Sequence, residues 1–91
     1  MNKEHQKYIK DNFSNISSIN EPMKKHSTFG IGGNAKAFVL PEKLAQIKNI
    51  LSYSNRYNIE VIFTGSGSNL LVSDKGFDGI IISLKKTFKK L

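Results

Sequence analysis

The sequence predicts an α+β fold, a small lobe built on a parallel β-α-β core. An amphipathic pattern of helical period over residues 42–57 lies between two short apolar segments, residues 37–40 and 60–63. A strand, a helix and a strand in this order form a unit with parallel strands and a right-handed crossover. At 91 residues the chain is long enough for one modest hydrophobic core.

Composition excludes several classes of function. The chain has fourteen basic and seven acidic residues, a net charge of +7, but Arg56 is its only arginine. A surface that reads bases would favour arginines in a concentrated patch, so we expect no specific nucleic-acid binding. The absence of cysteine excludes disulfides, thiolate metal sites and cysteine nucleophiles. With no signal-peptide pattern and no apolar run near the ~18 residues of a membrane span, we expect a cytoplasmic protein without membrane insertion.

Residues 1–19 are predicted to be a helical N-terminal extension. Apolar residues fall near one face over residues 2–16, and a run of serines and asparagines then breaks the pattern. We expect His5 to be exposed. Glu21-Pro22 favours extended backbone and opens the lobe proper, residues 20–91.

A first glycine-rich stretch occupies residues 26–35. Gly30, Gly32 and Gly33 exclude a regular helix and a regular strand interior, so a β-bulge or a close backbone approach is expected. His26 has no catalytic partner nearby in the sequence and is interpreted as an ordinary polar histidine.

The central helix is expected from Glu42 to about Tyr57, with Pro41 at its first position. Its buried stripe is predicted to contain Leu44, Ile47, Leu51 and Ser54, with Ile50 beside it. Asn58 suits the end of the helix. The strand at residues 60–63 then leads into a second glycine-rich stretch.

This second stretch, Thr64 to Asn69, separates the apolar residues 60–63 from Leu70-Leu71-Val72. Gly65 and Gly67 allow positive φ and close approach to a ligand. Successive N–H groups in such a loop can form an anion-binding nest, to which Ser66, Ser68 and Asn69 add donors. The loop is therefore either a phosphate cradle or a tight turn with solvated serines, and its residues leave both open.

Residues 73–79 have turn composition throughout, and residues 80–84 form a further apolar strand. Asp74 and Asp78 could suggest a cation site, but carboxylates in a glycine-rich turn are usually solvated. We expect no metal.

Spacing excludes two phosphate-binding classes. No glycine precedes a lysine, so there is no P-loop, and Gly65-Ser66-Gly67 lacks both the third glycine and the following helix of a dinucleotide fingerprint. A loop between strands that binds phosphate through amides and serines remains.

Segments 21–23, 26–35 and 64–79 together resemble the UDP-N-acetylenolpyruvoylglucosamine reductase (MurB) family, over about residues 20–84. The resemblance implies the first subdomain of a vanillyl-alcohol-oxidase/PCMH-type FAD-binding domain. It places the FAD pyrophosphate at Gly65, Ser66, Gly67, Ser68 and Asn69, with Leu70 closing the loop. Ile31, Gly32 and Gly33 would lie near the cofactor.

In this family NADPH reduces FAD, and the flavin reduces a UDP-sugar in peptidoglycan precursor synthesis. The resemblance implies no catalytic residue in this chain, because the family's proton donor lies in a later substrate domain. The chain is thus expected to be a fragment that supplies the pyrophosphate loop and is inactive alone. The alternatives are a non-catalytic FAD- or nucleotide-binding half that works with a partner chain, another oxidoreductase of the same flavin fold, and a basic interaction module.

Overall fold

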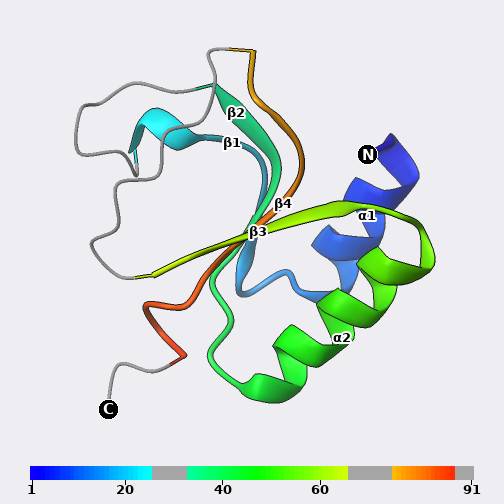
Figure 1. Cartoon of the computed structure of the whole chain (residues 1–91), viewed down its shortest axis with the longest axis vertical. Coiled ribbons are helices and arrows are strands. Elements are labelled where there is room, and N and C mark those ends of the chain that lie inside the picture. Colours follow the sequence, from blue (N-terminus) through cyan, green and yellow to red (C-terminus); the bar gives the residue numbers. More distant parts are fainter. Residues whose placement is uncertain (26–32, 66–74, 88–91) are drawn as a thin grey trace.

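The computed structural model describes residues 1–25, 33–65 and 75–87, which form one sheet with two helices packed on the same side (Figure 1). The elements in chain order are α1 (Lys3–Asn12), β1 (Ser17–Pro22), the 3-10 helix η1 (Met23–Lys25), β2 (Asn34–Val39), α2 (Leu44–Arg56), β3 (Glu60–Thr64) and β4 (Phe77–Ser83). The predicted α+β class is confirmed.

The sheet has the strand order β1-β2-β4-β3. β2 and β3 both run parallel to β4, whereas β1 runs antiparallel to β2. β2, α2 and β3 form the predicted parallel unit, but β4 lies between its two strands. Ile80, Ile81 and Ile82 are fully buried, and this apolar run suits a central strand covered on both faces.

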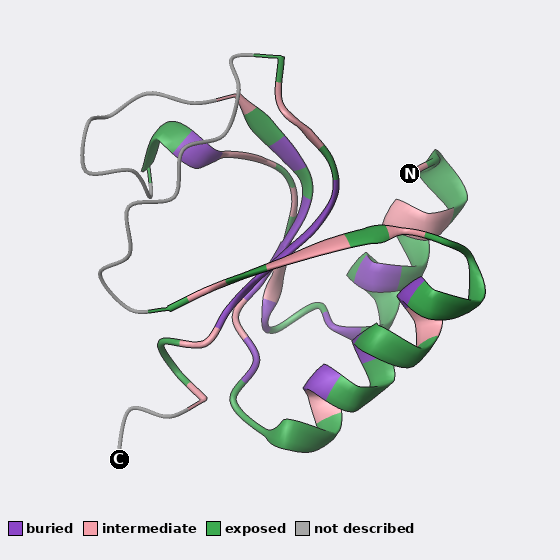
Figure 2. Cartoon of the chain, viewed as in Figure 1, coloured by how far each residue is buried: buried purple, intermediate pink, exposed green. Residues whose placement is uncertain are grey.

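Each face of the sheet has its own hydrophobic cluster. On the face covered by the helices, Ile9 of α1, Phe13 directly after α1, and Ile50 of α2 pack with Ile80 and Ile82 of β4. On the other face a smaller cluster contains Met23, Ala35, Phe38 and Ile81. Figure 2 shows the buried positions along the crossing strands and on parts of both helices.

Helix α2 differs from the prediction at its start and on its surface. It begins at Leu44, after Lys43, and not at Pro41 or Glu42. The Gln46 side chain fixes this start, because its Oε1 accepts hydrogen bonds from the N–H groups of Glu42 at 2.8 Å and Lys43 at 3.0 Å. Asn58 has a φ of 54°, the left-handed conformation expected after a helix.

The stripe of α2 that faces the core consists of Ile47, Ile50 and Ser54. Leu44 is 57% exposed and Leu51 is 36% exposed, so the prediction that both belong to the core was wrong. The buried stripe is centred on Ile50, which contacts the sheet cluster.

Two strands differ from the sequence prediction. β1 was not predicted, and it begins at Ser17, within the segment expected to be a helical extension. β4 begins at Phe77, so residues 77–79 are strand and not turn. Pro22 is tolerated in β1 because β1 lies at the edge of the sheet. Helix α1 lies inside the predicted helical range, and the boundary after residue 19 stays a prediction.

Candidate functional site

Two of the predicted cofactor-binding residues, Gly33 and Gly65, lie in the described part of the chain. The others lie outside the described residues: Ile31, Gly32, Ser66, Gly67, Ser68, Asn69 and Leu70. The structure therefore shows where the chain enters and leaves both glycine-rich stretches.

Gly65 directly follows β3, at the carboxyl end of that strand. The preceding residue, Thr64, pairs with Ser83, and its carbonyl accepts a hydrogen bond from the Leu84 N–H at 2.8 Å. The φ of Gly65 is not in the left-handed region, and a Cβ added there meets nothing within 4 Å. Neither backbone conformation nor packing against described atoms requires glycine at this position.

Gly33 lies at the opposite end of the sheet, just before β2. It lines a cavity of about 430 Å³ together with Asn20 of β1, Asn34 and Lys36 of β2, and residues 75–78 at the start of β4. The amino ends of β2 and β4 meet here, since Ala35 pairs with Phe77. The cavity thus brings the end of the first glycine-rich stretch beside the residues that follow the second.

Gly76 shapes this cavity through its backbone. Its φ is +90°, and a Cβ there would lie 2.5 Å from the Asn34 carbonyl oxygen. A residue with a side chain would be strained in this conformation and would push β2 and β4 apart. The close approach of the two strands at the cavity therefore depends on glycine.

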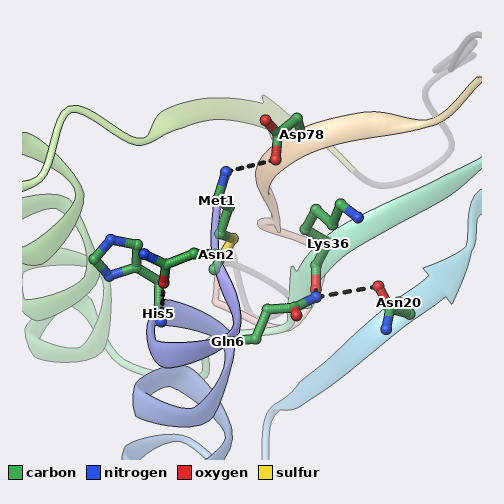
Figure 3. Close-up of polar contacts among 7 residues, drawn as sticks. All are labelled: Met1, Asn2, His5, Gln6, Asn20, Lys36 and Asp78. Carbon is green, nitrogen blue, oxygen red and sulfur yellow. Dashed lines mark hydrogen bonds and ion pairs between the residues drawn. The ribbon is translucent and has the colours of Figure 1, made fainter.

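The N-terminal segment holds polar groups beside the cavity (Figure 3). The Met1 ammonium donates a 2.6 Å hydrogen bond to Asp78 Oδ1 and forms an ion pair with it. This hydrogen bond lowers the pKa of Asp78, desolvation opposes it, and the charges of the ammonium and of Lys36 lower the pKa further. Gln6 Nε2 donates to Asn20 Oδ1 and to the Lys36 carbonyl, both at 3.1 Å.

Asn20 has a φ of 53° inside strand β1, an uncommon conformation for a residue other than glycine. Asparagine tolerates this region better than most residues. The bond from Gln6 fixes the Asn20 amide, so its Nδ2 donors are directed away from Gln6 (Figure 3). Sequence analysis missed Asn20, Lys36 and Lys75 as site residues, because no local motif connects them.

The prediction that His5 is exposed was wrong. His5 is half-buried, and its Nδ1 lies 2.7 Å from the Tyr53 hydroxyl of α2. Tyr8 stacks on Tyr53 with ring centroids 3.9 Å apart. Burial, with smaller effects of neighbouring Tyr57 and Tyr8, raises the pKa of Tyr53. This aromatic seam joins α1 to α2 and has no place in the expected cofactor site.

Other classes of site are absent from the described ranges 1–25, 33–65 and 75–87. Those ranges contain no group of three or more histidine, aspartate or glutamate side chains placed to hold a metal ion. Neither of their α-helices is long and apolar enough to cross a bilayer.

Residues 35–91 match the family of FAD binding domains. This chain belongs to the FAD-binding domain family. The match includes the stretch that begins at Gly65 and the strands on either side of it, so the FAD-binding domain contains both ends of the predicted phosphate loop.

This chain is also similar to curated reductases. It is 44% identical over 73 residues to UDP-N-acetylenolpyruvoylglucosamine reductase of Syntrophomonas wolfei, a match that covers 80% of this chain and 24% of the relative. The reductase of Desulfosudis oleivorans is 39% identical over 71 residues, 78% of this chain and 23% of that protein. UDP-N-acetylenolpyruvoylglucosamine reductase 2 of Bacillus anthracis is 42% identical over 64 residues, a match that covers 70% of this chain and 21% of that protein. The resemblance to this family is confirmed, and the chain spans about a quarter of the length of these relatives.

Proposed function

We propose that this chain contributes the pyrophosphate-binding part of the FAD site in a reductase of the UDP-N-acetylenolpyruvoylglucosamine reductase class. The loop would consist of Gly65, Ser66, Gly67, Ser68 and Asn69, with Leu70 closing it. Gly33, with Ile31 and Gly32, would lie near the same cofactor. The match of residues 35–91 to FAD binding domains supports this assignment.

The geometry of Gly65 is the structural observation that carries the proposal. Its φ is ordinary and no described atom lies within 4 Å of its Cβ position, so packing in the described part of the chain does not require glycine here. A backbone without a side chain at the end of a parallel strand lets a ligand approach the amides that follow. The ends of parallel strands are also where open α/β sheets bind their ligands.

The complete activity is part of the same proposal. FAD, when bound, would carry hydride from NADPH to the UDP-sugar in peptidoglycan precursor synthesis, in the cytoplasm. This chain's part would be to hold and orient the cofactor. The relatives' names support the reductase class, and the catalytic proton donor would come from sequence outside these 91 residues.

The proposal is tested by titrating the isotope-labelled chain with FAD and following backbone amide resonances. We expect saturable shifts at Gly65 and residues 66–70, even if the affinity is only roughly millimolar. A chain whose loop amides do not respond to FAD at that concentration contradicts the proposal.

Gly65→Ala sharpens this test. The added methyl group has room in the fold but would crowd a bound pyrophosphate, so we expect unchanged thermal stability and roughly tenfold weaker FAD binding. Ser52→Ala, on the exposed surface of α2, is the matched control and should bind FAD normally. If Gly65→Ala binds FAD as tightly as the unmodified chain, the cofactor does not approach this position.

A further inference from the structure

We propose that the cavity at the amino ends of β2 and β4 is a phosphate-binding site, with Lys36 and Lys75 as its cationic groups. The site lies at the end of the sheet opposite to Gly65, since Ala35 pairs with Phe77 whereas Thr64 pairs with Ser83. FAD has a single pyrophosphate, which the proposed function assigns to the Gly65 loop, so the ligand of this cavity is a second phosphate-bearing nucleotide. Phosphate binding at the cavity does not itself depend on the role proposed for the loop.

The charge of the cavity wall is the first argument. Among the described residues that line it, Lys36 and Lys75 are cationic and Asp78 is anionic. Asp78 also forms an ion pair with the Met1 ammonium, so positive charges outnumber negative ones among these groups. The wall therefore presents a net positive charge, which attracts phosphate in a chain that is itself strongly basic.

The second argument is the supply of neutral donors. Asn20 and Asn34 both line the cavity, and a side-chain amide nitrogen carries two N–H donors. Because Asn20 Oδ1 accepts from Gln6, its amide is fixed in one orientation, and the strained backbone at this residue is held by the same contact. Residues kept in uncommon backbone conformations are concentrated at ligand sites.

The third argument is size and shape. A volume of about 430 Å³ is within the usual range of small-ligand pockets. β2 and β4 approach each other closely at this cavity. Their approach depends on Gly76, because a Cβ at this position would collide with the Asn34 carbonyl oxygen. The cavity is therefore large enough for a phosphate and the sugar attached to it.

Inorganic pyrophosphate is the first probe, titrated against the isotope-labelled 91-residue chain. We expect saturable shifts of the Gly33, Lys36 and Gly76 amides that weaken with added salt. Lys36→Gln and Lys75→Gln together should lower the affinity roughly tenfold. Lys48→Gln, which removes an exposed lysine of α2 outside the cavity, should leave it unchanged.

Asp78→Asn is the reciprocal variant. It removes the one carboxylate among the described residues of the cavity wall while keeping the shape of the side chain, so we expect tighter pyrophosphate binding. Equal loss of affinity in the Lys48→Gln chain, or no difference between the double lysine variant and the unmodified chain, overturns the proposal, because binding would then be diffuse or elsewhere.

Separate titrations with FAD, NADPH and UDP distinguish the sources of the phosphate. If FAD moves the Gly76 amide without moving Gly65, the single pyrophosphate of FAD lies in the cavity and the proposed loop is refuted. If NADPH or UDP moves Gly76 without Gly65, the cavity serves a second nucleotide. If Gly65→Ala does not affect FAD binding, the role proposed for the loop is refuted, but phosphate binding in the cavity is not contradicted. The lysine variants test only the cavity.

Discussion

Gly79 is the third residue of β4 and pairs with Glu60, the first residue of β3. A Cβ at this position would collide with the carbonyl oxygen of Glu60 on β3 and with the ring of Phe77. Gly65 and Gly79 are therefore opposite cases within one small sheet. No described atom lies near the Cβ position of Gly65, whereas that of Gly79 is blocked, which makes them a matched pair for separating binding from folding.

Gly79→Ala is expected to destabilise the fold by about 1–3 kcal/mol, because the added methyl group must push β3 away from β4. The urea midpoint of unfolding measures the loss, and Gly65→Ala serves as the control with little change. Equal midpoints for Gly79→Ala and the unmodified chain would mean that the two strands do not approach each other as closely as the structure shows.

At the scale of elements, α2 shows how a helix can be predicted correctly and its buried stripe only in part. Ile47 and Ser54 are buried as predicted, but Leu44 and Leu51 are exposed, and Ile50, expected beside the stripe, lies at its centre. Packing against β4 selects the stripe that contains Ile50, and leaves Leu51 partly exposed. Hydrophobicity alone does not distinguish the two stripes, because leucine and isoleucine are about equally apolar.

Ile50→Ala is expected to lower the free energy of unfolding by about 2–5 kcal/mol, since a fully buried side chain leaves a cavity. Leu51→Ala should cost less than about 1 kcal/mol, because the side chain is already partly in water. Chemical denaturation of both variants under the same conditions measures the two losses in free energy of unfolding. A larger loss for Leu51→Ala would place the other stripe against the sheet.

Strand β1 is an element that the sequence analysis did not predict. Its sequence, Ser17 to Pro22, has one isoleucine among polar residues and no alternation that marks a strand. It is a strand because β2 offers an unpaired edge next to it, and five residue pairs form the antiparallel ladder between them. An element that exists through pairing with a distant segment leaves little signal in its own residues.

At the scale of the whole molecule, the N-terminal segment is part of the fold. Ile9 of α1 and Phe13 directly after it complete the larger core cluster, and the aromatic seam joins α1 to α2. The same segment supplies Met1 and Gln6, which reach Asp78 and Asn20 beside the proposed phosphate cavity (Figure 3). Contacts made by α1 therefore affect both global stability and the state of this cavity.

Global stability is expected to fall at alkaline pH through Tyr53. Burial raises the pKa of Tyr53 in the folded chain, so folding favours the neutral phenol. This contribution is complete below the unfolded pKa of about 10 and is lost as the pH rises through the higher folded value. A comparison with a variant isolates the contribution of Tyr53.

Tyr53→Phe supplies that comparison. It lacks the hydrogen bond to His5 at every pH, but it has no phenol to ionise at this position. The stability difference between the unmodified chain and Tyr53→Phe should be constant near neutral pH and shrink above about pH 10. Urea unfolding at several pH values measures it, and a difference that grows with pH would contradict the raised pKa.

The sequence by itself determined the local features of this chain. It identified the helices near residues 3–12 and 44–56, the apolar strands, the helix end at Asn58, the α+β class and the reductase-family resemblance. These features follow from periodicity, turn residues and short motifs, which depend on neighbours within a few positions. The pyrophosphate role of residues 65–70 was also inferred from such a motif and stays a prediction.

The tertiary structure alone decided which segments meet. It placed β4 between β2 and β3, recruited β1 to the sheet edge, and selected the Ile50 stripe of α2. It also brought Asn20, Lys36 and Lys75 from three separate segments to one cavity. The physical reason is that burial and pairing are properties of contacts between distant residues, and the pattern within one segment does not record which partner covers it.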